Sequence, residues 1–302
     1  MRWEDFRTSD NVEDRRGEGG GGGGGFGFPG GGAGGLGIGT IVILCIIGWV
    51  TGINPAILIG GAETVTRQRA PQEQQGQPQP DRRTGAPSDQ TGKFAAAILG
   101  NTEDVWKTVL PNQTGRQYTP TTMVLYTGGT RSGCGQARAA MGPFYCPLDK
   151  KVYLDTSFFK EMEQKFHVKG DFAYAYVIAH EVGHHVQDVL GILPKVQQKQ
   201  QQVGERESNA LSVRVELMAD CLAGVWAKNS NDRFNALEPG DIEEAMQAAS
   251  AIGDDKLQKQ SQGYVVPDSF THGSSAQRMR WFQTGYRSGQ TQSCDTFRAS
   301  QL

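Results

Sequence analysis

A histidine pair separated by four residues lies in the stretch AHEVGHH, which begins at Ala179. On an α-helix this spacing places the imidazoles of His180 and His184 on one face, one turn apart. Two imidazoles arranged in this way can bind one Zn²⁺, and Glu181 can then take a proton from a water molecule on the metal. The pattern therefore indicates a hydrolytic zinc site.

The sequence around this motif predicts a buried helix. Residues 172–190 are largely apolar, with Asp171 as the expected N-cap and Gly191 as the expected left-handed residue after the helix. The alternative is a core helix that carries isolated histidines. Burying such a polar cluster costs free energy unless it binds something, which favours the metal site.

The motif supplies two protein ligands, and the chain offers acids downstream for a third. The candidates are Glu205, Glu207, Glu216 and Asp220. Glu216 and Asp220 lie four apart in an apolar segment and share one helix face. We expect Glu216 to bind the metal and Asp220 to accept a hydrogen bond from a ligand histidine. The alternative is a helix surface with two solvated carboxylates.

Composition divides the 302 residues into segments. Residues 1–35 hold 14 of the 41 glycines, and we expect them to form a disordered N-terminal segment. Residues 36–59 are apolar and long enough for one transmembrane helix, and residues 60–92 are typical of a flexible Gln/Pro-rich linker. The catalytic domain is expected over residues 93–302. The net charge of -2 gives no basic footprint for nucleic acid.

The arginines on the two sides of residues 36–59 are balanced, so they do not set the orientation of the predicted helix. The cysteines favour an extracytoplasmic domain, because the four outside the apolar segment form an even set suited to disulfides. These are Cys134, Cys146, Cys221 and Cys294. Cys134–Cys146 and Cys221–Cys294 bridges are possible, but four cysteines allow three connectivities, and free buried thiols are the alternative.

The remaining pattern predicts an α+β fold. We expect strands over residues 121–126 and 151–155, with a loop from Gly133 to Pro147 between them. Helices are expected over residues 94–99, 155–166, 172–190, 206–228, 239–252, 254–260 and 274–286. The strand at residues 151–155 is also a candidate to bind a substrate backbone by β-addition.

Taken together, these features resemble the bacterial neutral zinc metallopeptidase family, which is similar to the gluzincins. The resemblance rests on the glycine-rich N-terminus, the membrane segment, PFYCP at 143–147, YLD at 153–155, AHEVGHH and the Glu216–Asp220 pair. It covers essentially the whole chain. It implies a zincin-like fold, with a small sheet packed on the motif helix and a mostly helical C-terminal half.

A second resemblance concerns the stretch from Thr271 to Arg278. Membrane-anchored gluzincins of the heat-shock and prenyl-protein protease type carry a similar Thr-His-Pro stretch followed by an arginine. This implies that His272 donates a hydrogen bond to the oxyanion and that Arg278 orients a carboxylate. Gly273 replaces the proline of that pattern. The alternative for His272 is a surface histidine at a helix start, and His185 is expected to point away from the metal.

We therefore expect a membrane-anchored zinc endopeptidase with one Zn²⁺ and a protein or peptide substrate. The expected location is the inner membrane, single-pass, with the N-terminus inside and the catalytic domain periplasmic. The alternatives are a metal-binding scaffold for protein interaction and a hydrolase of a non-peptide cell-envelope amide.

Overall fold

A five-stranded mixed sheet forms one layer of the protein in the computed structural model, which describes residues 1–17, 83–85, 87–138 and 141–302. Its strand order is β2-β1-β3-β7-β6, and β1, β3 and β7 run parallel while β2 and β6 run antiparallel to their neighbours. The strands are β1 (Val12–Asp14), β2 (Arg83–Thr84), β3 (Thr122–Tyr126), β6 (Phe144–Cys146) and β7 (Lys151–Asp155). A separate hairpin joins β4 (Gly129–Ser132) to β5 (Gly135–Arg138).

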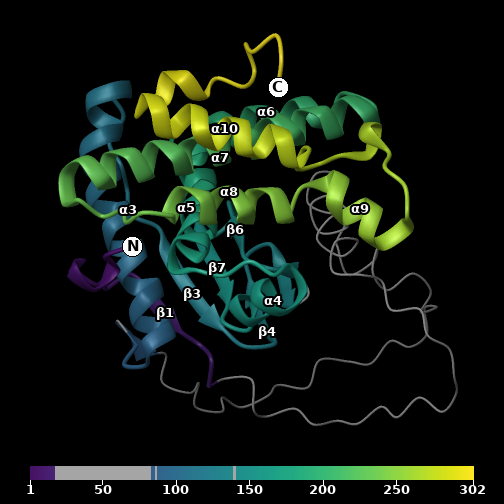
Figure 1. The fold of residues 1–302 in the computed structure, drawn as a ribbon. Coiled ribbons are helices and arrows are strands. Elements are labelled where there is room, and N and C mark those ends of the chain that lie inside the picture. Colours follow the sequence, from purple (N-terminus) through teal and green to yellow (C-terminus); the bar gives the residue numbers. More distant parts are fainter. Residues whose placement is uncertain (18–82, 86, 139–140) are drawn as a thin grey trace, which may run out of the picture.

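Helices form about half of the described chain and most of its regular structure (Figure 1). They are α3 (Gln90–Thr114), α4 (Phe158–Lys165), α5 (Asp171–Val189), α6 (Ile192–Gln200), α7 (Glu205–Phe234), α8 (Asp241–Ala251), α9 (Asp254–Gln262) and α10 (Ser275–Ser288). Short 3-10 turns are η1 (Trp3–Asp5), η4 (Pro267–Ser269) and η5 (Thr291–Cys294). The expected α+β class, mostly helical with small sheets, is confirmed.

Helix α5 lies at the centre because it contacts both layers. It packs on β6 and β7 of the sheet and on α3, α7 and α8. Its apolar run, including Phe172, Tyr176 and Val182, is fully buried. Burial of this helix on all sides explains why its sequence is apolar almost throughout. The helix ends where expected, at Gly191, which takes a left-handed φ of 73°.

Glycines set the closest helix contacts around α7. A Cβ on Gly183 of α5 would lie 3.1 Å from the carbonyl oxygen of Ala219, so the two helices touch between the two candidate metal-binding pairs. A Cβ on Gly285 of α10 would overlap the carbonyl oxygen of Cys221. The small residues therefore let α5 and α10 approach opposite sides of the same turns of α7.

The expectation that residues 1–35 are disordered is wrong for residues 1–17. Residues 12–14 form β1, which lies inside the sheet between β2 and β3. The glycine-rich composition that suggested disorder begins only after this segment, and a strand of three residues is too short to show a period-2 pattern. The expected start of the domain at residue 93 is also wrong, because β1 and β2 belong to its sheet and α3 begins at Gln90.

Three further expectations are corrected. The helix predicted at residues 94–99 is the 25-residue α3, which continues through Gly100 and contains Pro111. The predicted loop from Gly133 to Pro147 contains β5 and β6, whose short strands carry too little pattern to be seen. The strand at residues 151–155 is present, but β3 and β6 pair with its two edges. Among the described residues, only residues 154–155 lack a strand partner on the β6 side, so most of this strand is already paired.

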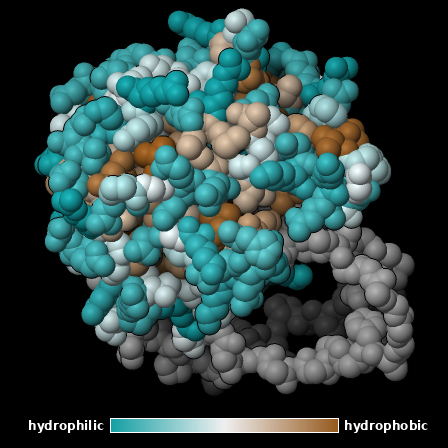
Figure 2. Space-filling view, viewed as in Figure 1, coloured by the Kyte–Doolittle hydropathy of each residue, from teal (hydrophilic) through white to brown (hydrophobic). Residues whose placement is uncertain are grey.

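None of the helices in the described part of the chain is long and apolar enough to cross a bilayer. The predicted transmembrane segment at residues 36–59 and residues 60–82 of the predicted linker lie outside the described residues. The end of the predicted linker is wrong, because residues 83–84 form β2 and α3 begins at Gln90. On the face in Figure 2, hydrophobic residues are interspersed among hydrophilic ones. Large apolar side chains that are exposed in the described ranges are Leu148, Phe234, Tyr264, Val265 and Val266.

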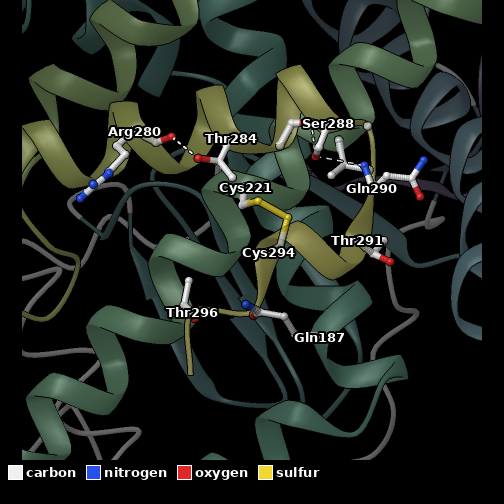
Figure 3. The surroundings of a disulfide bond; sticks show 12 residues. Gln187, Cys221, Arg280, Thr284, Ser288, Gln290, Thr291, Cys294 and Thr296 are labelled. Atoms are coloured by element: carbon white, nitrogen blue, oxygen red, sulfur yellow. Dashed lines mark hydrogen bonds between the residues drawn. A yellow bond between two sulfur atoms is a disulfide. The ribbon is translucent and has the colours of Figure 1, made fainter. Parts of the chain in front are cut away.

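Two disulfides are present, Cys134–Cys146 and Cys221–Cys294. The first joins the tip of the β4–β5 hairpin to β6. The second ties η5 to the middle of α7, beside α10 (Figure 3), and both of its cysteines are buried. Cys221 directly follows Asp220 in the sequence. The bridge therefore fixes the C-terminal tail to the helix turn that carries the candidate site.

We expect the Cys221→Ala/Cys294→Ala double variant to lose about 2–4 kcal/mol of unfolding free energy, because the bridge closes a long loop of sequence separation 73. The Cys134→Ala/Cys146→Ala pair is the matched control, since its separation is only 12. Loop entropy predicts a loss about 1.5 kcal/mol smaller for the control. Urea unfolding of both variants measures the difference, and equal losses would contradict the loop-entropy explanation.

Candidate metal centre

Three side chains predicted to bind metal come together where α5 crosses α7. The ligand atoms of His180, His184 and Glu216 all lie within 4.8 Å of one another. The Nε2 atom of His180 is 3.1 Å from Glu216 Oε2, and that of His184 is 3.5 Å from Glu216 Oε1. All three residues are buried or nearly so. One carboxylate thus faces two imidazoles across a space where a single cation can sit.

The other ring nitrogens of the two histidines have acceptors. His180 Nδ1 lies 2.8 Å from Asp220 Oδ1, and His184 Nδ1 lies 2.9 Å from the side-chain oxygen of Gln187. Gln187 is itself held by its amide nitrogen, which donates to the carbonyl of Val215. Protons on both Nδ1 atoms leave the Nε2 lone pairs for a metal. Two imidazole nitrogens and one carboxylate are a donor set that suits Zn²⁺.

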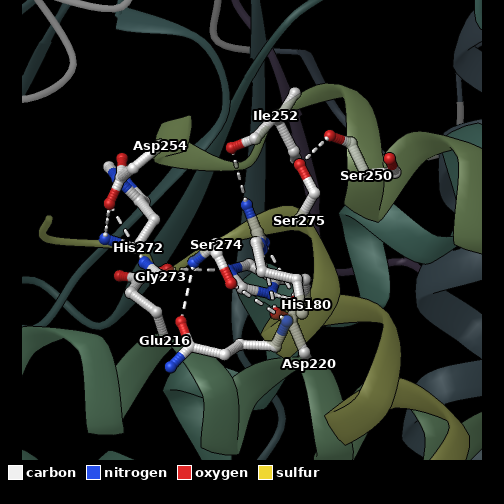
Figure 4. Close-up of polar contacts among 12 residues, drawn as sticks. His180, Glu216, Asp220, Ser250, Ile252, Asp254, His272, Gly273, Ser274 and Ser275 are labelled. Atoms are coloured by element: carbon white, nitrogen blue, oxygen red, sulfur yellow. Dashed lines mark hydrogen bonds and ion pairs between the residues drawn. The ribbon is translucent and has the colours of Figure 1, made fainter. Parts of the chain in front are cut away.

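Asp220 is the centre of a buried charge network (Figure 4). Arg278 of α10 donates from Nε to Asp220 Oδ2 and from Nη2 to Asp220 Oδ1, both at 2.9 Å. The hydroxyl of Tyr176, one turn before His180, donates to Asp220 Oδ1 at 2.5 Å. Asp220 is 0% exposed and Arg278 2%. A bidentate pair of this kind fixes the carboxylate that in turn fixes the ring of His180.

The charges at the site favour a bound cation. Burial by itself lowers the pKa of His180, but the carboxylates of Asp220 and Glu216 outweigh it and raise this pKa to about 10. Burial opposes ionisation of Glu216, but the histidines hold its pKa well below the usual range. The site therefore carries an ionised carboxylate that stabilises positive charge at the imidazoles, and a metal ion can take the place of a proton.

Glu181 occupies a different environment from Glu216. Burial raises its pKa above the usual value, and the nearby histidines oppose this only in part. Among the residues that the structure describes, no side chain or backbone group hydrogen-bonds its carboxylate. A carboxylate that is buried, unpaired and raised in pKa is suited to accept and release a proton.

The loop before α10 brings His272 to the same site (Figure 4). Asp254, at the start of α9, accepts hydrogen bonds from the backbone N–H groups of Thr271, His272 and Gly273 at 2.7, 2.7 and 3.0 Å. Its other oxygen lies 3.2 Å from His272 Nδ1. Burial lowers the pKa of His272, but Asp254 and Glu216 raise it above its usual value. His272 is thus oriented by Asp254 and lies close enough to Glu216 for their charges to interact.

Gly273 explains why this loop differs from the Thr-His-Pro pattern. Its φ is +95°, a conformation that proline cannot adopt because its ring fixes φ near −65°. A Cβ at this position would also lie 3.2 Å from Leu217 and 3.3 Å from Val213 of α7. The glycine lets the loop pack closely on the helix that carries Glu216.

The histidine after the motif, His185, lies away from the candidate ligands. Its Nε2 donates to the carbonyl of Thr119 at 2.6 Å, and its Nδ1 is 3.1 Å from the hydroxyl of Tyr145 on β6. The same hydroxyl donates to Asp188 of α5. This residue therefore joins the motif helix to the edge of the sheet.

Sequence reasoning missed Asp254, Gln187 and Tyr176. Asp254 is 18 residues from His272, and only the packing of the α9 start against the loop joins them. The positions of the other two in the sequence do carry a local signal. Gln187 lies three residues after His184 and Tyr176 four residues before His180, so both share a helix face with a candidate ligand.

In an assay of the peptide hydrolysis expected from the sequence, we expect Asp254→Asn to move the alkaline limb of the pH–rate profile to lower pH. The raised pKa of His272 depends on the Asp254 charge, and a protonated His272 is lost as the pH rises through that value. The amide therefore makes His272 lose its proton at lower pH. Asp268→Asn, at an exposed position on the neighbouring turn, is the control. An unchanged alkaline limb would show that the Asp254–His272 pair does not set it.

Comparisons with known proteins agree on one family. The family model described as "Putative neutral zinc metallopeptidase" matches residues 1–297. The chain is 49% identical over 297 residues to "Uncharacterized protein YpfJ" of Escherichia coli (strain K12), covering 98% of this chain and 99% of that protein. It is 44% identical over 231 residues to "Uncharacterized protein Mb2605" of Mycobacterium bovis, covering 73% and 75%. No solved structure matches.

Proposed function

This chain belongs to the putative neutral zinc metallopeptidase family, and from that premise we propose that it is a zinc-dependent endopeptidase. The observation that carries the proposal is the convergence of His180, His184 and Glu216 beside the unpaired carboxylate of Glu181. A cluster with only a structural role would not need the buried, unpaired carboxylate of Glu181. In the proposed site, His180, His184 and Glu216 would hold Zn²⁺, and we propose a zincin-like fold.

Bound Zn²⁺ supplies Lewis acidity, which polarises a carbonyl and lowers the pKa of water towards about 7. Glu181 accepts the proton of the attacking water and passes it to the leaving amine nitrogen. His272, held by Asp254, donates a hydrogen bond to the oxygen that becomes negative in the transition state. Asp220 and Gln187 keep the two ligand rings in the tautomer that presents Nε2.

The outer edge of β6 offers a place for the substrate backbone. In the described part of the chain no strand pairs with this edge, whereas β7 covers the other. Tyr145 of β6 is tied to Asp188 and His185 of α5, which fixes the strand next to the motif helix. We propose that an extended peptide pairs with this edge through backbone hydrogen bonds.

The test is a metal analysis combined with a proteolysis assay on the full-length protein. We expect about one zinc per chain, cleavage of an unfolded protein substrate, loss of cleavage with a chelator and recovery when zinc is restored. Zinc-loaded protein that leaves unfolded substrates intact would contradict the proposal. Release of products from peptidoglycan alone would point instead to a cell-envelope amide.

We also propose that the domain works in an oxidising compartment outside the cytoplasm. The two disulfides support this location, since such bridges are rare in reducing cytosol. Thiol labelling of the denatured protein, with and without reductant, tests it in cells. The expected result is one reactive thiol before reduction, from Cys45, and five afterwards. Five free thiols without reductant would contradict the proposal.

A further inference from the structure

The N-terminal residues belong to the same folded unit as the candidate site. Strand β1 pairs in parallel with β3 along residues 12–14, and the backbone bonds continue on both sides of it. Met123 N–H donates to the carbonyl of Asn11, and Arg15 N–H donates to that of Leu125, both at 2.8 Å. On its other side β1 pairs with β2, so it is an interior strand of the sheet.

Side chains also fix this segment to α3. The buried carboxylate of Glu103 accepts hydrogen bonds from Ser9 Oγ and Asn11 Nδ2, each at 2.7 Å, and from Arg7 Nη2 at 2.6 Å. Glu103 is 1% exposed, and without residues 1–17 it would lose these three donors. Hydrogen bonds to an ionised carboxylate are strong, so these three hold residues 7–11 against α3.

This arrangement constrains the topology of the chain. Residues 1–17 and residues 83–302 lie on either side of the long apolar stretch in the sequence, yet they share one sheet. A helix at residues 36–59 that crossed a bilayer once would place them in different compartments. An even number of crossings, or none, keeps them together.

We infer that residues 1–17 and the candidate site lie on the same side of any membrane. A single membrane crossing by residues 36–59 is therefore incompatible with the complete five-stranded sheet. The orientation expected from the sequence, with the N-terminus inside and the domain outside, would remove β1 from the sheet. This inference rests on strand pairing and is independent of the proposed peptidase activity.

Thiol accessibility in the full-length protein tests the inference. In a Cys45→Ala background the four remaining cysteines are bridged, so a single added cysteine is the only target. Asp10→Cys reports on the N-terminal segment and Lys259→Cys on α9, and both positions are exposed. The probe is a membrane-impermeant maleimide applied to right-side-out and inside-out vesicles.

We expect both cysteines to react in the same vesicle orientation and to be protected in the other. Reaction of the two in opposite orientations would overturn the inference. If the protein is found in the soluble fraction, the mass of the purified chain tests the inference instead. The intact chain supports the inference, and a product lacking residues 1–17 overturns it.

A cross-link provides a second measurement on the same membranes. Arg7 Nη2 lies 2.9 Å from Asp104 Oδ1, so a short bifunctional thiol reagent should join Arg7→Cys to Asp104→Cys. A protease site inserted between residues 63 and 80 then separates the fragments unless they are joined. The control pair is Arg7→Cys with Lys259→Cys, since α9 and the N-terminus lie at opposite ends of the molecule in Figure 1. Separation of the fragments in the 7/104 pair would overturn the inference.

Discussion

Glu181→Gln is expected to lower kcat/KM for a peptide substrate by about 10²–10⁴-fold while the zinc content stays unchanged. The amide keeps the size of the side chain but cannot accept the proton of the attacking water. Because no described residue hydrogen-bonds this carboxylate, its replacement breaks no hydrogen bond with them. Metal analysis and steady-state kinetics on the same preparation measure the two effects separately.

Two variants make this result interpretable. Glu207→Gln changes an exposed glutamate at the start of α7 and should leave both metal and activity as they are. Glu216→Gln should instead lose zinc, since it removes the only carboxylate of the proposed ligand set. Near-normal turnover by the Glu181→Gln protein would show that the proposed proton acceptor is wrong.

Asp220→Asn is expected to lower the unfolding free energy by about 3–5 kcal/mol, because it leaves the buried guanidinium of Arg278 without its counter-charge. It should also weaken zinc binding by about 10–100-fold, since the acceptor for His180 Nδ1 loses its charge. Denaturant unfolding of the zinc-free protein measures the first effect, and zinc titration against a competing chelator measures the second.

The two effects can be separated by a second substitution. Adding Arg278→Met removes the unpaired charge and should restore part of the stability but none of the zinc affinity. Asp232→Asn, an exposed position on the same helix, is the matched control. An Asp220→Asn protein that binds zinc like the parent would remove Asp220 from the proposed site, whatever its stability.

The same network predicts how stability falls in acid. Burial would raise the pKa of Asp220, but Arg278 and His180 hold it at about 2, below the ordinary 3.8. A lowered carboxylate pKa contributes stability above the unfolded value, and that contribution is lost as the pH falls towards the folded value. The Asp220→Asn protein should therefore lose less stability between about pH 4 and pH 2 than the parent does.

The sequence by itself determined the parts of the site that depend on helical periodicity. His180 and His184 are four residues apart on one helix, and so are Glu216 and Asp220, so each pair shares a face wherever the helix packs. The apolar flanks also indicate that both helices are buried, because a polar cluster inside an apolar run needs a partner.

Only the tertiary structure decided what depends on contacts between distant segments. Asp254 supports His272 because the start of α9 meets the loop before α10, and no spacing in the sequence encodes that meeting. Strand β1 takes its place beside β3 through backbone hydrogen bonds, which any sequence of three extended residues can make. Helical periodicity depends only on the order of side chains along the sequence. Sheet pairing and loop placement depend on the packing of the whole chain.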